Sequence, residues 1–161
     1  MKRMVMVAVV AIGMTCAMQA QIAVKHLQND NSPIATGVWA GDTLYLSGQL
    51  ASPATPADAA KGTAAVYGDT KTQAFSALTK IQGLLKAQGL DMKDVVKMTV
   101  FLAGDPANGG KLDFAGLQAS YTQFFGTKEQ PNKPARSAVQ VAALAAPWAL
   151  VEIEVIAVKG R

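Results

Sequence analysis

Residues 69–102 read DTKTQAFSALTKIQGLLKAQGLDMKDVVKMTVFL and contain the clearest structural signals in the chain. In their first part, apolar side chains recur at helical spacing: Ala74, Leu78, Ile81 and Leu85. This periodicity predicts an amphipathic helix over 69–88, and Thr70 and Gln73 have the spacing of a capping box at its start. The second part, 94–102, is rich in β-branched and aromatic residues and predicts a strand.

Further elements lie on both sides of this stretch. Short runs of strand-forming residues predict four more strands, at 22–27, 43–50, 136–142 and 150–158. Apolar spacing after a capping Asp predicts a second helix over 113–125. Two helices and about five strands in this order, with no internal repeat or linker, predict a single α+β domain with a mixed or antiparallel sheet.

Side chains that alternate along the strands predict two different sheet faces. One face is apolar and suits cover by both helices: Val96, Met98, Val100, Leu102, Leu44, Leu46, Val151, Ile153 and Val155. The opposite face mixes polar and apolar side chains: Tyr45, Ser47, Gln49, Lys97, Thr99, Phe101, Gln140, Glu152 and Glu154. A face of this kind is commonly an oligomer interface or the wall of a cleft, and a plain solvated sheet face is the alternative.

The first residues of the chain have the order of a secretory signal peptide. Lys2 and Arg3 make a positive start, 4–14 is an apolar run, and small residues follow up to Ala20. The apolar run is too short to span a bilayer. We therefore expect 1–20 to be cleaved and the mature protein to be exported, as a periplasmic or secreted protein with no membrane attachment.

The remaining residues, 21–161, form the single predicted domain. Without Lys2 and Arg3 the count of Lys plus Arg falls from 15 to 13 against 11 acidic residues, so the net charge falls from +4 to +2. Such a weak charge gives no strong case for a nucleic-acid or membrane partner. The one Cys lies within the expected leader, and a mature chain without a thiol suits an oxidising compartment.

The composition excludes several classes of protein. The residues are 50% hydrophobic and 16% charged, which is too apolar for a disordered chain. One Cys excludes a disulfide framework. One His leaves little for a His-based metal site or a Ser-His-Asp triad, so we expect no metal ion.

Arg136 and Glu152 are the residues best suited to chemistry. Arg136 follows a loop at the start of a predicted strand, and Glu152 and Glu154 share one face of what we expect to be a neighbouring strand. A guanidinium group in this place can bind a carboxylate ligand through two hydrogen bonds, and a partly desolvated Glu can accept a proton from water. From spacing alone the commoner arrangement is a structural Arg–Glu ion pair between two strands.

Several motifs resemble those of the RidA/YjgF/UK114 proteins, the reactive imine and enamine deaminases. They are LSGQ at 46–49, DVVKMTVFL at 94–102, YTQFF at 121–125, PARSAVQV at 134–141 and VEIEVIAV at 151–158. The last two are the most specific, and together the motifs extend over most of residues 21–161.

The resemblance implies a chorismate-mutase-like α+β fold with a mixed sheet, assembled as a homotrimer with sites in the clefts between subunits. It implies that Arg136 binds the carboxylate of a small 2-imino acid and that Glu152 orients the attacking water. The products are a 2-keto acid and ammonia, and no organic cofactor or metal is needed because the imine is already an electrophile. Four further positions are implied to line the cleft: Ile34, Gly48, Gln118 and Ala138.

Two alternative functions remain open beside the deaminase. Ile34 stands where deaminating members usually carry a tyrosine, which favours a trimeric protein that binds a small carboxylate without converting it. A nucleic-acid binder is the third hypothesis, and it predicts an RNA affinity that falls steeply with salt.

Overall fold

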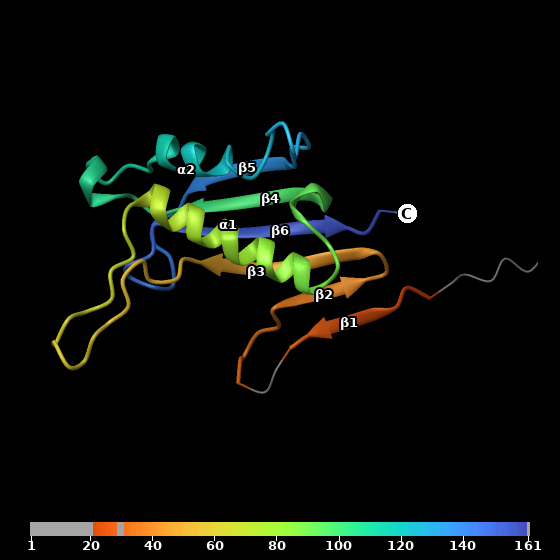
Figure 1. The fold of residues 1–161 in the computed structure, drawn as a ribbon, viewed down its shortest axis with the longest axis horizontal. Coiled ribbons are helices and arrows are strands. Elements are labelled where there is room, and N and C mark those ends of the chain that lie inside the picture. Colours follow the sequence, from red (N-terminus) through yellow and green to blue (C-terminus); the bar gives the residue numbers. More distant parts are fainter. Residues whose placement is uncertain (1–20, 29–30, 161) are drawn as a thin grey trace, which may run out of the picture.

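The chain forms a six-stranded sheet with two α-helices on one face (Figure 1). The computed structural model describes residues 21–28 and 31–160. The strands are β1 Val24–Leu27, β2 Gly37–Ala40, β3 Thr43–Leu50, β4 Val95–Leu102, β5 Ala135–Gln140 and β6 Val151–Val158. The α-helices are α1 Thr70–Ala87 and α2 Phe114–Tyr121, and short 3₁₀ turns occupy Met92–Asp94 and Pro106–Asn108. The predicted leader, 1–20, lies outside the described residues.

The sheet is mixed. Its strand order is β1-β2-β3-β6-β4-β5, in which β4 and β5 run parallel and the other neighbouring pairs are antiparallel. The α+β architecture predicted from the sequence is confirmed. No helix in the described part of the chain is long and apolar enough to cross a membrane.

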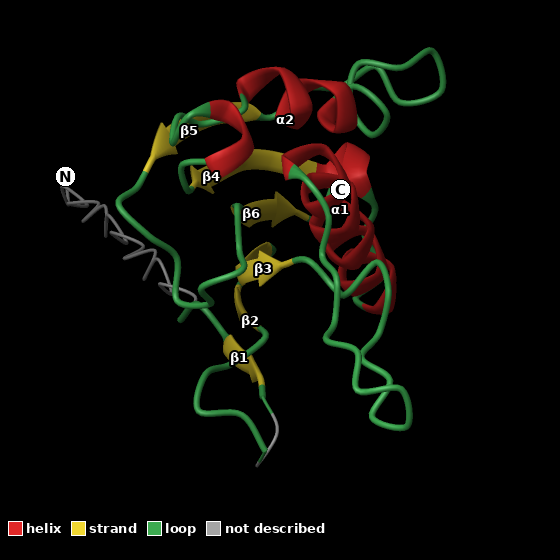
Figure 2. Cartoon of the chain, turned by 90° about the vertical axis from the view of Figure 1, so that its left-hand side faces the viewer, coloured by secondary structure: helices red, strands yellow, loops and turns green. Residues whose placement is uncertain are grey.

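The core lies between the sheet and the two helices, as Figure 2 shows edge-on. The four apolar positions of the predicted helical stripe, Ala74, Leu78, Ile81 and Leu85, are fully buried. Most of the predicted apolar strand positions face them and are buried: Leu44, Leu46, Met98, Val100, Leu102, Val151, Ile153 and Val155. The opposite face of the sheet has no helix over it among the described residues (Figure 2).

Three side chains lie on a different face from the one predicted. The register shifts between Val95 and Lys97, so Val95 is buried and Val96 is 48% exposed. A second shift between Leu46 and Gln49 pairs Gln49 with the core residue Ile153. Gln140 pairs with buried Leu102 and bonds to Leu112 and Gly110 on the helix side. The first two errors have one cause, since a β-bulge adds a residue and inverts the alternation beyond it.

The sequence-based prediction also missed β2 and misplaced helix ends. β2 is only four residues long and is joined to β3 by the turn Gly41-Asp42. So short a segment beside a turn is difficult to distinguish from a loop in the sequence. Asp69, rather than Thr70, caps α1 by accepting a hydrogen bond of 2.8 Å from the Thr72 N–H. α2 ends at Tyr121 instead of residue 125.

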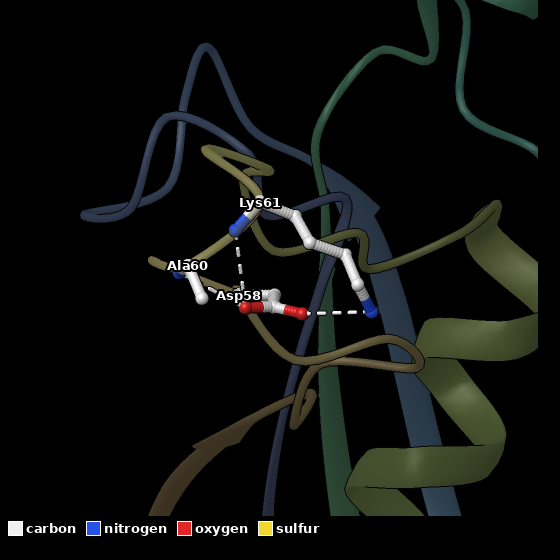
Figure 3. Close-up of polar contacts among 3 residues, drawn as sticks. All are labelled: Asp58, Ala60 and Lys61. Carbon is white, nitrogen blue, oxygen red and sulfur yellow. Dashed lines mark hydrogen bonds and ion pairs between the residues drawn. The ribbon is translucent and has the colours of Figure 1, made fainter.

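The segment between β3 and α1, residues 51–69, is a loop that projects from the sheet (Figure 1). Isolated bridges between Thr55 and Val66 and between Asp58 and Thr63 fold it back on itself. At its tip Asp58 forms an ion pair of 3.0 Å with Lys61 and accepts backbone hydrogen bonds from the same turn (Figure 3). The Lys61 ammonium group lowers the pKa of Asp58, and backbone donors add to this effect.

Candidate functional site

Arg136 lies on the helix-covered side of the sheet. Its partner in the parallel β4–β5 pair is the core residue Met98, and partners on adjacent strands point to the same face. The Arg136 Nη2 donates a hydrogen bond of 2.9 Å to Oε1 of Gln118 on α2. The guanidinium carbon lies 4.1 Å from the ring centre of Tyr121 and 5.7 Å from that of Phe114, both on α2 as well.

One guanidinium nitrogen of Arg136 has no partner among the residues that the structure describes. Nη1 is buried and makes no hydrogen bond to any of them, whereas Nη2 donates to Gln118. A buried charged donor without an acceptor is unfavourable, because it has lost its hydration and gained nothing in return. The arrangement therefore suits an additional acceptor, and a carboxylate oxygen is the strongest common partner of a guanidinium N–H.

Burial of Tyr121 raises the pKa of its phenol, and the positive charge of Arg136 opposes this rise without cancelling it. The phenol is therefore neutral at ordinary pH, and its ring presents an uncharged face to the guanidinium group. A neutral aromatic face attracts a cation without competing for its hydrogen-bond donors.

Glu152 lies on the open face of the sheet. It pairs with Phe101 on β4 and with Leu50 on β3. A side chain on Gly48 would overlap Oε1 of Glu152, and its Cβ would lie 2.9 Å from the carboxyl carbon. The bulge in β3 between Leu46 and Gln49 thus leaves the Glu152 carboxylate in the space that a side chain at 48 would occupy.

A single chain does not bring the two predicted catalytic side chains together. β4 lies between β5 and β6, so Arg136 and Glu152 are not on neighbouring strands as expected. They point to opposite faces, since Arg136 shares a row with buried Met98 and Glu152 with Phe101. The expectation of a structural ion pair between Arg136 and Glu152 is therefore wrong. The only ion pair within residues 21–28 and 31–160 joins Lys61 to Asp58.

Three of the four other predicted cleft residues lie at one of these two places, and Ile34 lies at neither. Gln118 contacts Arg136 directly, and Ala138 shares its face, as the partner of buried Val100. Gly48 contacts Glu152. Ile34 lies in the loop before β2 and is 64% exposed.

Tyr121 and Phe114 are the functional candidates that sequence reasoning missed. Both are apolar positions of the predicted helix 113–125, for which the sequence suggests only a packing role, and Phe114 is 48% exposed. Phe114, Gln118 and Tyr121 are spaced by four and three residues, so they share one face of α2. The spacing of Phe114 and Tyr121 from Gln118 is therefore the sequence signal that could have identified them as site residues.

A groove and the metal-binding side chains are two further features of the described residues that bear on a site. A groove of about 750 Å³ lies between α1 and residues 123–132, and neither Arg136 nor Glu152 lines it. No group of three His, Cys, Asp or Glu side chains in the described ranges is placed to hold a metal ion.

The geometry defines an α+β protein of the YjgF type, with a six-stranded mixed sheet and two helices. The crystal structure of the YjgF gene product from E. coli is similar over 84% of this chain and 99% of that one, with a TM-score of 0.62 and 33% identity. A family model described as Endoribonuclease L-PSP matches residues 16–159. The chain belongs to this family, which is the RidA/YjgF/UK114 family that its motifs indicate.

Two further relatives carry information about chemistry. The 2-iminobutanoate/2-iminopropanoate deaminase of Capra hircus is 41% identical over 128 residues, which are 80% of this chain and 81% of the relative. The structure of E. coli TdcF with bound serine is 32% identical, with a TM-score of 0.62, and the match covers 88% of this chain and all of that one.

Proposed function

We propose that this protein hydrolyses small 2-imino acids and their enamine tautomers to 2-keto acids and ammonia. The observation that supports this most directly is the buried Nη1 of Arg136, a charged donor held in place with no acceptor. Relatives named as 2-iminobutanoate/2-iminopropanoate deaminases act on substrates whose carboxylate would supply that acceptor. The serine bound to TdcF is a small amino acid and fits the same size class.

The proposed site is shared between subunits. Arg136 and Glu152 lie on opposite faces of one chain, so a second copy must supply one of them. The open face that carries Glu152 also carries apolar side chains: Tyr45, Phe101, Val139, Ile156 and Val158. Burial of that face in a homotrimer would remove this apolar surface from water and place Glu152 of one subunit against Arg136 of the next.

The reaction in this site needs one proton acceptor and one carboxylate anchor. The substrate carboxylate binds the Arg136 guanidinium group, and Glu152 accepts a proton from a water as its oxygen bonds to the imine carbon. The C=N electron pair moves to nitrogen and gives a carbinolamine. Glu152 gives this proton to the nitrogen, then accepts the hydroxyl proton and passes it to the same nitrogen. The C–N bond breaks, ammonia leaves, and the C–O bond becomes the carbonyl of the 2-keto acid.

A coupled assay tests this proposal. An amino-acid oxidase generates the imine in place, and release of the 2-keto acid is followed with and without the protein. We expect faster release with the wild type and no acceleration with Arg136→Ala or Glu152→Gln. Glu154→Gln is the matched control, since Glu154 is exposed on the same face of β6, and it should keep full activity with an unchanged assembly.

The second candidate function is binding of a small carboxylate without conversion. The exposed Ile34, where deaminating relatives usually carry a tyrosine, favours it. In that case 2-ketobutyrate would protect the wild type against thermal unfolding, and Arg136→Ala would lose the protection, while no variant would alter keto-acid release.

We also propose that the protein works outside the cytoplasm. The support is the charged start at Lys2 and Arg3 followed by the apolar run 4–14. The N-terminal sequence of the protein from a periplasmic or culture fraction tests this. A mature N-terminus close to Ala20 is expected, and an intact Met1 in a cytoplasmic fraction would contradict it.

A further inference from the structure

We propose that Tyr121 is the positioning residue for Arg136: its ring holds the guanidinium plane so that Nη1 is presented to the ligand. This inference rests on the proposed carboxylate-binding function of Arg136. It assigns a role to a residue that the sequence indicates only as the first position of the YTQFF motif at 121–125.

The contact between Tyr121 and Arg136 has the geometry of a cation–π interaction. The guanidinium carbon lies 4.1 Å from the ring centre of Tyr121, within the distance of about 6 Å at which such interactions are significant. Tyr121 is 7% exposed and stacks on Phe125, with ring centres 4.9 Å apart. The ring is therefore held by the core and acts as a fixed surface under a long and otherwise flexible side chain.

The ring and Gln118 restrict different motions of the guanidinium group. The hydrogen bond to Gln118 Oε1 fixes Nη2, and rotation about that bond would still swing Nη1. The Tyr121 face removes this freedom because a guanidinium group stacks with its plane against the ring. Nη1 is then the terminal nitrogen left for a carboxylate that approaches in the guanidinium plane.

Preorganisation of this kind affects ligand binding rather than the bond-breaking step. An arginine already held in its binding conformation loses little freedom when a carboxylate arrives. Without the ring, the arginine would lose this conformational freedom each time a carboxylate binds, and the affinity would fall. The proton transfers depend on Glu152 of the neighbouring subunit and are not changed by the ring.

Substitution of Tyr121 by leucine and by phenylalanine tests the role. Tyr121→Leu keeps an apolar side chain but removes the π face, and we expect the Kd of 2-ketobutyrate and the KM of the imine to rise about tenfold. We expect kcat to stay within about twofold, since the ring does not act on the reacting atoms. Tyr121→Phe keeps the face and should match the wild type in all three quantities. A Tyr121→Leu protein with unchanged Kd, or with a loss in kcat alone, would overturn the proposal.

Nuclear magnetic resonance of the arginine side chains gives a readout that does not depend on deaminase activity. The chain contains three arginines, Arg3, Arg136 and Arg161, so the Nε–H signal of Arg136 is readily assigned. The ring should shift this signal upfield in the wild type and in Tyr121→Phe, and Tyr121→Leu should abolish the shift. An identical signal in Tyr121→Leu would refute the positioning role even in an active enzyme. Failure of the proposed function is distinct, because it would show as a wild type that neither binds 2-ketobutyrate nor releases keto acid.

Discussion

Glycine is required at two positions in the early strands, for a different physical reason at each. At Gly37 an added Cβ would lie 2.7 Å from the backbone oxygen of Tyr45, which cannot move without breaking the β2–β3 pair. At Gly48 the added Cβ would meet the carboxylate of Glu152, the far end of a flexible side chain. Gly37 is therefore required by the fold, and Gly48 by the position of one functional side chain.

Gly48→Ala and Gly37→Ala should separate these two requirements. We expect Gly37→Ala to lower the free energy of unfolding by about 1–3 kcal/mol because the backbone must shift. Gly48→Ala should keep the wild-type stability and displace Glu152, with a fall in kcat of about a hundredfold. Urea denaturation and the coupled deaminase assay measure the two effects. A fully active Gly48→Ala protein would show that the Glu152 position described above is not the working one.

The buried phenol of Tyr121 predicts an alkaline loss of stability. Its folded-state pKa is raised above the ordinary value of 10.0, first by burial and against the opposing effect of Arg136. Below pH 10.0 the phenol is protonated in both states, so its contribution to stability is constant. Between that value and the folded-state pKa only the unfolded chain loses the proton, so the free energy of unfolding falls there.

Tyr121→Phe provides the comparison for this prediction. It has no phenol to titrate, so its urea midpoint should fall less than that of the wild type as the pH rises from neutral to about 11. The remaining fall, due to other groups, should be common to both proteins. Parallel midpoint curves for the two proteins across the whole range would contradict the burial effect.

At the scale of elements, one buried side chain joins α1 to the loops at the Glu152 end of the sheet. Gln73 is 1% exposed and donates 3.1 Å hydrogen bonds to the backbone oxygens of Gly68 and Trp148. Its Oε1 accepts a bond of 2.8 Å from Leu150, two residues before Glu152. The Tyr67 and Trp148 rings stack with their centres 3.4 Å apart and join the same two loops. Gln73 is therefore a link between helix and strand, and not the capping residue predicted from its spacing.

Gln73→Ala should lower the free energy of unfolding by about 3 kcal/mol, because it leaves buried backbone groups without partners and opens a cavity. Chemical denaturation measures this loss. Gln123→Ala is the control, since the exposed Gln123 side chain donates a hydrogen bond to the backbone oxygen of Ala119 within the same turn. It should cost less than about 0.5 kcal/mol. Equal stabilities of the two variants would contradict the linking role.

At the scale of the whole molecule, the uncovered sheet face is the feature that a single chain leaves unexplained. Tyr45 on β3 and Val139 on β5 are 47% and 45% exposed there. Lys97 donates a hydrogen bond of 3.2 Å to Ser137 on the same face. This mixture of apolar and polar groups suits a permanent contact between copies better than free solvent.

Val139→Asp should prevent assembly without unfolding the chain, because the new charge is solvated in the monomer and would be buried in the proposed trimer. Light scattering should give about three times the single-chain mass for the wild type and one chain mass for the variant. The monomer should have no deaminase activity, since Arg136 and Glu152 then lie on opposite faces. Val66→Asp, at an exposed site on the projecting loop, should remain trimeric and active. An active monomer would contradict the shared site.

The sequence by itself determined the local features. The period of apolar residues in 69–88 predicted α1 within a residue at each end, and the alternation in 150–158 predicted β6 within one residue. The motifs around Arg136 and Glu152 identified the family and the candidate residues. These features depend on neighbours along the chain, where the helical and strand periods are set by backbone geometry alone.

The tertiary structure decided where those residues stand relative to one another. The insertion of β4 between β5 and β6, and the bulges that move Val96 and Gln49, arise from pairing between segments distant in sequence. So do the placement of Tyr121 beneath Arg136 and the separation of Arg136 from Glu152 by the sheet. A shift of one residue in strand pairing inverts the face of every side chain beyond it, so a local pattern names the functional groups but only the paired sheet assigns them to a side.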